Sequence, residues 1–230
     1  MNLTPTQVAA QVARDIPDGA YVNLGIGQPV LVGNEVPHDR EIVFHSENGM
    51  LGMGPAPAPG EGNTDLINAA KGPVTLLPGG SYFHHTDSFL MMRGGHIDIS
   101  VLGAFEVSAA GDLANWSTGD MSKPPAVGGA MDLSVGAKQL FVMMTHRTKG
   151  GTPKIVERCS YPLTAARVVS RIYTDLAVLD IDDSGLVVTA MVESLSPDRL
   201  RELTAAPLRF AEEVRTIPAP RTADRSAPTM

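Results

Sequence analysis

The sequence predicts a three-layer α/β/α domain, Rossmann-like, whose central sheet is mostly parallel. Continuous apolar runs, such as residues 97–103 and 176–181, alternate along the chain with segments of helical periodicity. Such runs are typical of strands buried on both faces, and their alternation with helices is typical of parallel sheets. No internal repeat or linker divides the chain, so we expect one domain over residues 1–212. Because the composition turns to Pro, Ala, Thr and Arg near the end, we expect a loose tail over residues 213–230.

The first helix is predicted from its start signal. Thr4 can cap a helix, Pro5 suits the first helical position, and Gln7 completes a capping box. Further helices are expected at residues 29–36, 83–92, 130–137, 164–173 and 197–203. Strands are expected at residues 21–26, 41–45, 74–77, 97–103, 139–144, 154–158, 176–181 and 186–192, with a hairpin over residues 106–116.

Composition and charge narrow the possible function classes. The chain has 230 residues, enough to bury a sizeable core, and 43% of them are hydrophobic. Its net charge of −7 argues against nucleic-acid binding, which rests on basic patches. No apolar run approaches the length of a membrane span, and the N-terminus lacks the features of a signal peptide. The single cysteine, Cys159, fits a reducing compartment, so we expect a cytoplasmic protein that binds no membrane.

Two glycine-containing segments follow neighbouring predicted strands. Gly25-Ile26-Gly27 comes after the first strand, and Ser46-Glu47-Asn48-Gly49 comes after the next. Sites in parallel sheets form at the carboxyl ends of strands, so we expect these two segments to lie side by side. The sequence therefore places the lone acid Glu47 at a candidate functional site.

Two interpretations of this site compete at first. One is a dinucleotide site, because Gly25 and Gly27 follow a strand and Glu47 lies where an acid would meet a ribose. Val30, however, occupies the place of the third glycine of that motif. The other interpretation is a purely structural turn, in which Gly49 supplies a positive φ.

A longer set of motifs resembles the β subunit of the family I CoA-transferases, as in 3-oxoacid and 3-oxoadipate CoA-transferases. The run SENGMLGMGP at residues 46–55 resembles their active-site motif. Further matches follow the order of the chain, at residues 22–27, 65–69, 93–98, 111–116, 128–133 and 174–178. The resemblance covers residues 3–210. Two departures are Met50, where the family usually has an aliphatic residue, and the stiff Lys123-Pro124-Pro125 loop, where it commonly reads Lys-Gly-Met.

The resemblance implies that Glu47 is the nucleophile, which attacks an acyl-CoA and then carries CoA as a glutamyl thioester. Its carboxylate is ionised at neutral pH, because the reference pKa of glutamate is about 4.3. Thiolate is a good leaving group, since a thiol pKa is about 8.5. The chemistry therefore needs neither a metal nor a cofactor, and the CoA thioester is a substrate.

Acyl transfer also needs donors for the developing oxyanion, and glycine-rich loops let backbone N–H groups approach a carbonyl closely. We expect this substrate and CoA site to include Gly25, Gly27, Gly128 and Gly129, with Ala130 beside them. The alternative is that these glycines only make tight turns. Asn48 is also expected at this substrate and CoA site, where it either orients Glu47 or only forms the turn.

The resemblance further implies a partner α subunit of similar fold and an α₂β₂ or related oligomer. It implies transfer of CoA from succinyl-CoA to a 3-oxo acid, and short matches favour 3-oxoadipate over acetoacetate. A related acyl-CoA hydrolase, or a non-catalytic or NAD-binding protein, is the alternative. His84 and His85 could contact the acid; as metal ligands they lack a third partner at usable spacing.

Overall fold

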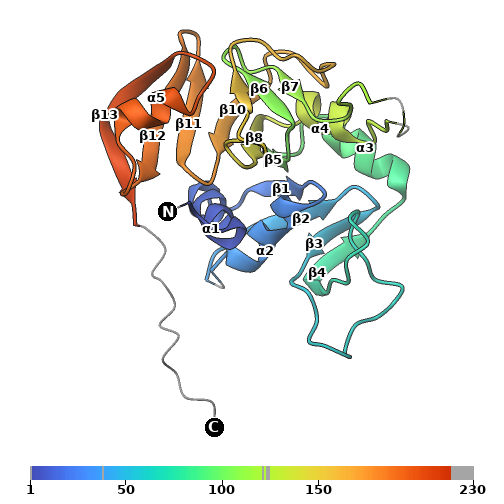
Figure 1. The fold of residues 1–230 in the computed structure, drawn as a ribbon. Coiled ribbons are helices and arrows are strands. Elements are labelled where there is room, and N and C mark those ends of the chain that lie inside the picture. The colour runs from blue at the N-terminus through green and yellow to red at the C-terminus, as the bar shows by residue number, and fades with distance from the viewer. Residues whose placement is uncertain (1, 38, 121, 123–124, 219–230) are drawn as a thin grey trace.

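The computed structural model describes residues 2–37, 39–120, 122 and 125–218 (Figure 1). Lys123 and Pro124 of the predicted stiff loop, and residues 219–230 of the predicted tail, lie outside the described residues. Within the described chain, one sheet of ten strands dominates, in the order β13-β12-β11-β10-β8-β5-β1-β2-β3-β4. Its strands are β1 Tyr21–Leu24, β2 Val43–Ser46, β3 Met50–Met53, β4 Leu76–Tyr82, β5 Ile99–Leu102, β8 Gln139–Met143, β10 Val169–Tyr173, β11 Ala177–Asp182, β12 Gly185–Val192 and β13 Leu208–Ile217.

The middle of this sheet is parallel. Strands β10, β8, β5, β1 and β2 pair in parallel, while β3 and β4 on one side and β11 and β12 on the other pair antiparallel. A small sheet of β6 (Glu106–Ser108), β7 (Leu113–Ala114) and β9 (Ile155–Val156) contains the predicted hairpin. The predicted α/β fold class is confirmed.

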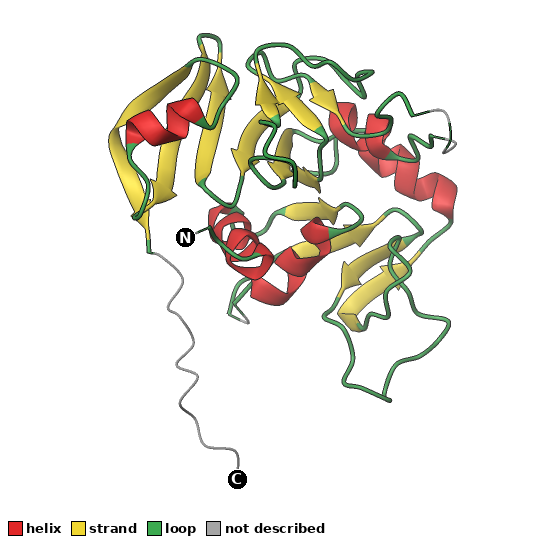
Figure 2. Cartoon of the chain, in the orientation of Figure 1, coloured by secondary structure: helices red, strands yellow, loops and turns green. Residues whose placement is uncertain are grey.

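Helices cover both faces of the sheet, as Figures 1 and 2 show. They are α1 Pro5–Asp15, the 3₁₀ turn η1 Gln28–Leu31, α2 Val32–Glu35, α3 His85–Arg93, α4 Ala130–Gly136 and α5 Pro197–Glu202. Strand β8 explains the two layers: Phe141 and Met143 pack in the core with α1, whereas Leu140 and Val142 pack in the core with α3 and α4. An apolar run buried on both faces therefore supplies two separate cores.

The predicted start of α1 is confirmed. The Thr4 hydroxyl accepts a hydrogen bond from the Gln7 amide at 3.3 Å, and the Gln7 side chain accepts one from the Thr4 amide at 2.9 Å. This reciprocal pairing satisfies amide groups that a helix start leaves without partners. The helix buries its Val8, Val12 and Ala13 face against the sheet.

The helix predicted at residues 164–173 is wrong, because residues 169–173 form β10 between β8 and β11. Arg167 adopts a positive φ of 56°, which breaks a helical path. Before it, Ala165 bridges to Leu113 of the hairpin. Tertiary pairing and the β-branched residues around Val169 thus override the helical spacing.

Besides β10, strands β3 and β13 were not predicted from the sequence, and the expected start of the tail at residue 213 is wrong. β3 runs through the glycine-rich stretch after Glu47, where a Cβ on Gly52 would lie 2.9 Å from the Gly80 Cα of β4. Strands β3 and β4 need glycine at these positions because their backbones approach closely. At the other end, β13 continues to Ile217, so residues 213–217 belong to the sheet and not to a loose tail.

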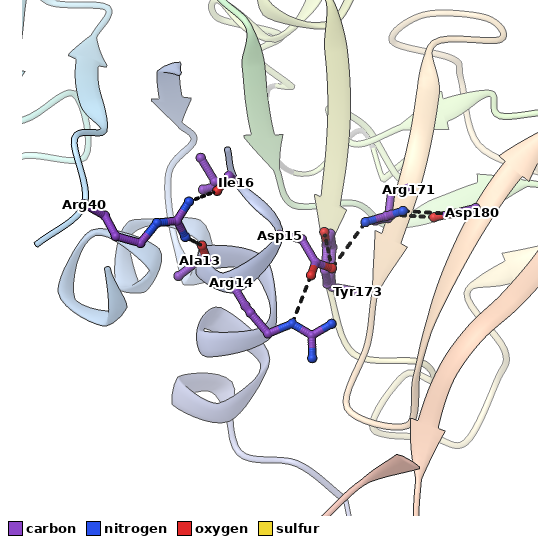
Figure 3. A network of polar contacts seen from close by, with 8 residues as sticks. All are labelled: Ala13, Arg14, Asp15, Ile16, Arg40, Arg171, Tyr173 and Asp180. Atoms are coloured by element: carbon purple, nitrogen blue, oxygen red, sulfur yellow. Dashed lines mark hydrogen bonds and ion pairs between the residues drawn. The ribbon is translucent and has the colours of Figure 1, made fainter. Parts of the chain in front are cut away.

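A polar network fastens α1 to the sheet (Figure 3). Arg171 of β10 bonds to both carboxylate oxygens of Asp180 on β11, and its other amino group lies 3.2 Å from Asp15 at the end of α1. The Tyr173 hydroxyl donates to the same Asp15 carboxylate at 3.1 Å. In the same view, Arg40 donates to the carbonyls of Ala13 and Ile16, which caps the carboxyl end of α1.

Candidate active site

Glu47 lies at the carboxyl end of β2, as the sequence predicted. Strands β1 and β2 are parallel, with Asn23 paired to His45. Two residues further on, Gly25 leaves β1 and Glu47 leaves β2 at the same edge of the sheet. The two glycine-containing segments are thus neighbours, at the position where parallel sheets bind ligands.

The turn after Glu47 depends on Gly49. This glycine has a φ of 112°, and a Cβ there would lie 2.2 Å from the Phe83 carbonyl oxygen. The Gly49 amide donates to the Ser46 carbonyl at 3.0 Å, and the Gly49 carbonyl accepts from the Phe83 amide at 3.0 Å. A positive φ and a closely packed backbone both require glycine here. The turn therefore holds the backbone of Glu47 in place between β2 and the start of α3.

Asn48 secures this turn from its other side. Its side-chain oxygen accepts from the Ser46 hydroxyl at 2.6 Å, and its side-chain nitrogen donates to the Ile67 carbonyl at 2.8 Å. The Ser46 hydroxyl also accepts from the Ala69 amide at 3.1 Å. The Asn48 side chain is committed to the segment around residues 67–69 and does not line the cavity beside Glu47.

A cavity of about 490 Å³ opens beside Glu47, with one wall formed by the loop before α4. Of the residues predicted for the site, it brings together Glu47, Gly25, Gly128, Gly129 and Ala130. Gly27 lies outside the lining, where it begins η1 with a φ of 92°. The rest of the lining is Asn23, Leu24, Ile26, Ala69, Leu102, Gly103, Ala104, Phe105, Asn115, Ala126, Val127 and Leu133.

Gly129 leaves room for the Glu47 carboxylate because it has no side chain. A Cβ added at Gly129 would lie 2.3 Å from the Glu47 Oε2 atom, so no other residue type fits without displacing the carboxylate. Within the described chain, the amides of Gly128 and Gly129, which line the cavity, donate to no acceptor.

The amides of the other predicted contacts are already in use. Gly25 donates to the Val101 carbonyl at 2.8 Å, and Ala130 donates to the Val127 carbonyl at 3.2 Å. Gly25 serves close packing instead, because a Cβ there would lie 2.7 Å from the Leu102 side chain. The sequence identifies the glycines but does not show which of them keep an unbonded amide and which only allow close packing.

Glu47 is half-buried, and burial raises the pKa of its carboxyl above the ordinary value, an effect that the nearby His85 charge partly opposes. His85 is the first residue of α3, and its ring lies 4.8 Å from that of Phe89. Phe89 in turn would be 3.4 Å from a Cβ on Gly129. Glu47, Gly129, Phe89 and His85 thus form one continuous cluster.

A buried polar triad beneath Glu47 was missed by the sequence analysis. The Asn23 side-chain nitrogen lies 3.0 Å from Nδ1 of His45 and 3.3 Å from the His45 carbonyl, and His45 Nε2 lies 2.8 Å from the Ser88 hydroxyl. Because the His45 carbonyl can only accept a hydrogen bond, the Asn23 atom near it must be the side-chain nitrogen, which donates. The same nitrogen therefore donates to Nδ1 of His45, and the proton of the neutral ring lies on Nε2. Burial lowers the pKa of His45 to about 4, so the ring is neutral at pH 7. The sequence signal that could have revealed this triad is the presence of polar residues, such as Asn23 and His45, within otherwise apolar strands.

The geometry disfavours a dinucleotide at this edge. The segment after Gly27 forms one 3₁₀ turn and the four-residue helix α2, not the long helix whose amino end binds a pyrophosphate.

His84 caps α3 by accepting from the Thr86 amide at 3.2 Å. Across the described part of the chain, no three His, Cys, Asp or Glu residues are grouped so that they could hold a metal. In the same part, no helix is long and apolar enough to cross a membrane.

A half-buried carboxylate beside two free backbone donors, at the carboxyl ends of parallel strands, defines a site suited to acyl transfer. The coenzyme A transferase family model matches residues 6–202. The chain is 60% identical over 206 residues to a subunit of the 3-oxoadipate CoA-transferase of Pseudomonas putida, with 90% of this chain and 96% of that protein covered. The chain belongs to the coenzyme A transferase family.

Other relatives extend this comparison. A subunit of the succinyl-CoA:3-ketoacid coenzyme A transferase of Helicobacter pylori is 46% identical, with 86% of this chain and 95% of that protein covered. A crystal structure of an acyl-CoA transferase from Escherichia coli O157:H7 superposes with a TM-score of 0.74 at 17% identity. That match covers 94% of this chain and 44% of the other, so this chain spans less than half of that longer protein. At such low identity the likeness concerns the fold alone.

Proposed function

We propose that this chain is the β subunit of a CoA-transferase that moves CoA from succinyl-CoA to a 3-oxo acid, with 3-oxoadipate as the favoured acceptor. The observation that carries the proposal is the Glu47 carboxylate, half-buried at the end of β2 and directly against Gly129 in the cavity. Membership of the coenzyme A transferase family supports it, because the chemistry of that site needs one reactive carboxylate.

In the first half-reaction, the Glu47 carboxylate adds to the thioester carbonyl carbon of succinyl-CoA. The carbon–sulfur bond breaks, which gives a succinyl-glutamyl anhydride and CoA thiolate. The thiolate adds to the glutamyl carbonyl, succinate leaves, and CoA remains as a thioester on Glu47. The carboxylate of the acceptor then repeats these steps in reverse. No net proton, electron or water is consumed.

The residues around Glu47 suit these steps. The free amides of Gly128 and Gly129 would donate to the oxyanion of each tetrahedral intermediate. Partial burial leaves the carboxylate less solvated, and therefore a stronger nucleophile than in water. The turn closed by Gly49 keeps the Glu47 backbone fixed, which supports the close positioning that weak reactants need.

The choice of acceptor rests on the relatives. Two relatives named as 3-oxoadipate CoA-transferase subunits are 60% and 56% identical to this chain. Relatives named for 3-ketoacids are 44% and 46% identical. This difference supports 3-oxoadipate over acetoacetate. We also propose a place in the reducing cytoplasm, because the single cysteine, Cys159, has no partner for an internal disulfide.

We also propose that the active enzyme contains an α subunit, in an α₂β₂ or related assembly. The relatives are named as subunits, which supports this. The cavity beside Glu47 is only partly enclosed by this chain, so a partner could complete its walls.

The proposal is tested by expressing this chain alone and together with an α-type subunit. We expect CoA exchange from succinyl-CoA only in the complex, with a larger kcat/KM for 3-oxoadipate than for acetoacetate. Full turnover by this chain alone would contradict the need for a partner, and equal or reversed preference would remove the assignment of the acceptor. Release of acid without any acceptor would favour a hydrolase.

A further inference from the structure

A second, smaller crevice adjoins the Glu47 cavity at the same edge of the sheet. It has a volume of about 170 Å³, and Ile26, Gly103 and Ala104 line both spaces. Met143, at the end of β8, lines the crevice on the side away from β2. The two spaces therefore lie next to each other along the carboxyl ends of β2, β1, β5 and β8.

The crevice has a single charged lining residue, Lys154. Its backbone is fixed on both sides, because the Lys154 amide donates to the His146 carbonyl at 3.0 Å and its carbonyl accepts from the Val107 amide at 3.0 Å. The side chain is half-buried. Throughout the described residues, its ammonium group forms no hydrogen bond and no ion pair within 4 Å.

The nearest carboxylate does not satisfy this cation. Asp175 acts on Lys154 through its charge, which partly opposes the lowering of the lysine pKa by burial. Its oxygens, however, accept from the His146 amide at 2.6 Å and from the Asn2 side chain at 2.6 Å. A partly buried cation without a bonded counter-charge is costly, so an arriving anion would be bound favourably.

The other walls indicate which anion fits. Met143, Met144 and Pro29 supply apolar surface, and Gln28 and Thr145 are the uncharged residues able to form side-chain hydrogen bonds. The crevice, at about 170 Å³, is much smaller than the Glu47 cavity of about 490 Å³. It suits a carboxylate at the end of a short aliphatic chain.

We propose that Lys154 binds the distal carboxylate of dicarboxylic acyl groups whose reacting carbonyl lies at Glu47. This proposal rests on the proposed function, since it assigns a substrate contact within that reaction. Both half-reactions place an acyl group at the same glutamate, one after the other. A single anchor thus serves the donor succinyl group and a dicarboxylic acceptor alike, and it selects against monocarboxylic acids.

The test uses the complex with the α subunit and the variant Lys154→Met. The expected loss in kcat/KM for the succinyl-CoA and 3-oxoadipate pair is about 10- to 100-fold, the size of one lost charge-assisted hydrogen bond. Exchange between acetoacetyl-CoA and labelled acetoacetate, a pair without distal carboxylates, should stay within about threefold of the unmodified complex. Lys138→Met is the matched control, because it removes an exposed lysine that forms an ion pair with Asp98. It should leave kcat/KM unchanged for both substrate pairs.

Three outcomes separate the possibilities. An equal loss for both pairs would overturn the inference, because it would indicate a structural role or a contact with CoA itself. Unchanged exchange of the dicarboxylic pair would also overturn it. Failure of the unmodified complex to exchange CoA at all would instead contradict the proposed function.

A second measurement needs no variant. Amine-reactive labelling of Lys154 in the unmodified complex is followed by mass spectrometry, with succinate, adipate or butyrate present. We expect succinate and adipate to slow the labelling of Lys154 at least severalfold and butyrate to leave it unchanged. Equal protection by all three acids, or by none, would overturn the inference.

Discussion

The network around Arg171 and the sheet edge around Glu47 both contain partly buried charges. The charges of the network are bonded to opposite charges, whereas those at the sheet edge are not. Arg171 is 30% exposed and bonds to Asp180 and Asp15, so its charge is neutralised by carboxylates from two elements (Figure 3). Glu47 and Lys154, both half-buried, have no bonded counter-charge within the described chain. The Arg171 network joins α1, β10 and β11. Glu47 and Lys154 line spaces at the carboxyl ends of the central strands, where we expect substrates to bind.

The largest effect on this comparison is expected from Glu47→Gln in the complex. Exchange should be abolished, because a neutral amide does not attack a thioester, while the free energy of unfolding should stay equal or rise by up to about 1 kcal/mol. Removal of a charge that burial disfavours explains the sign. Exchange kinetics and chemical denaturation measure the two quantities, with the exposed Glu41→Gln as control. Strong destabilisation by Glu47→Gln would show that Glu47 stabilises the fold, as Arg171 is expected to do, and would contradict this comparison.

Gly129→Ala should have the next largest effect. The φ of Gly129 is −80°, which alanine tolerates, so the change acts through its added methyl group. That methyl would lie 2.3 Å from the Glu47 carboxylate and must displace it. We expect a loss of about 100-fold in kcat, in line with the cost of moving a reacting atom by about 1 Å. Gly33→Ala, where a Cβ meets only Leu24 at 3.5 Å, is the control and should keep wild-type exchange.

Arg171→Met tests the structural side of the comparison. It leaves Asp180 without its cation and removes one of the two cations of Asp15, which keeps Arg14 at 3.2 Å, and we expect the free energy of unfolding to fall by about 1–3 kcal/mol. Exchange per folded complex should be unchanged. Arg209→Met breaks the more exposed pair with Asp182 and should cost clearly less stability than Arg171→Met. Denaturant titrations measure both variants, and equal stability losses would show that the network of Figure 3 adds nothing special.

A smaller effect is expected in the pH dependence of exchange. Only ionised Glu47 is nucleophilic, and burial raises its pKa, so kcat/KM should fall as pH drops through a value above the ordinary pKa of glutamate. The His85 charge opposes that shift. His85→Gln should therefore move the acid limb to higher pH. His84→Gln, at the cap of α3, is the control and should leave the limb in place; a downward shift in His85→Gln would contradict the cluster.

Much of the fold follows from local sequence signals, and the rest depends on long-range pairing. The capping box at Thr4 and the apolar run of β5 carry their own evidence, and both predictions are confirmed. The helix predicted at residues 164–173 is wrong because its apolar spacing fits a strand once β8 and β11 lie alongside. β3 escaped prediction because its glycines, which weaken an isolated strand, are needed where it passes Gly80.

The candidate site divides in the same way. The motif around Glu47 marks the carboxylate, and the parallel order of β1 and β2 follows from the fold class. The sequence could not tell that the Gly25 amide is already bonded or that the Gly129 amide is free, because both facts depend on neighbouring backbone. His45 and Lys154 were missed for a related reason: their surroundings come from strands and loops far apart in the chain.

The covalent state of Glu47 offers the most direct test of its role. The complex is mixed with succinyl-CoA without an acceptor, quenched in acid and digested, and the peptide containing Glu47 is analysed by mass spectrometry. We expect a CoA thioester on Glu47 that borohydride reduces and that 3-oxoadipate removes. Efficient exchange of CoA by the same complex, with no adduct on Glu47 at any time of quenching, would contradict the central role of this residue.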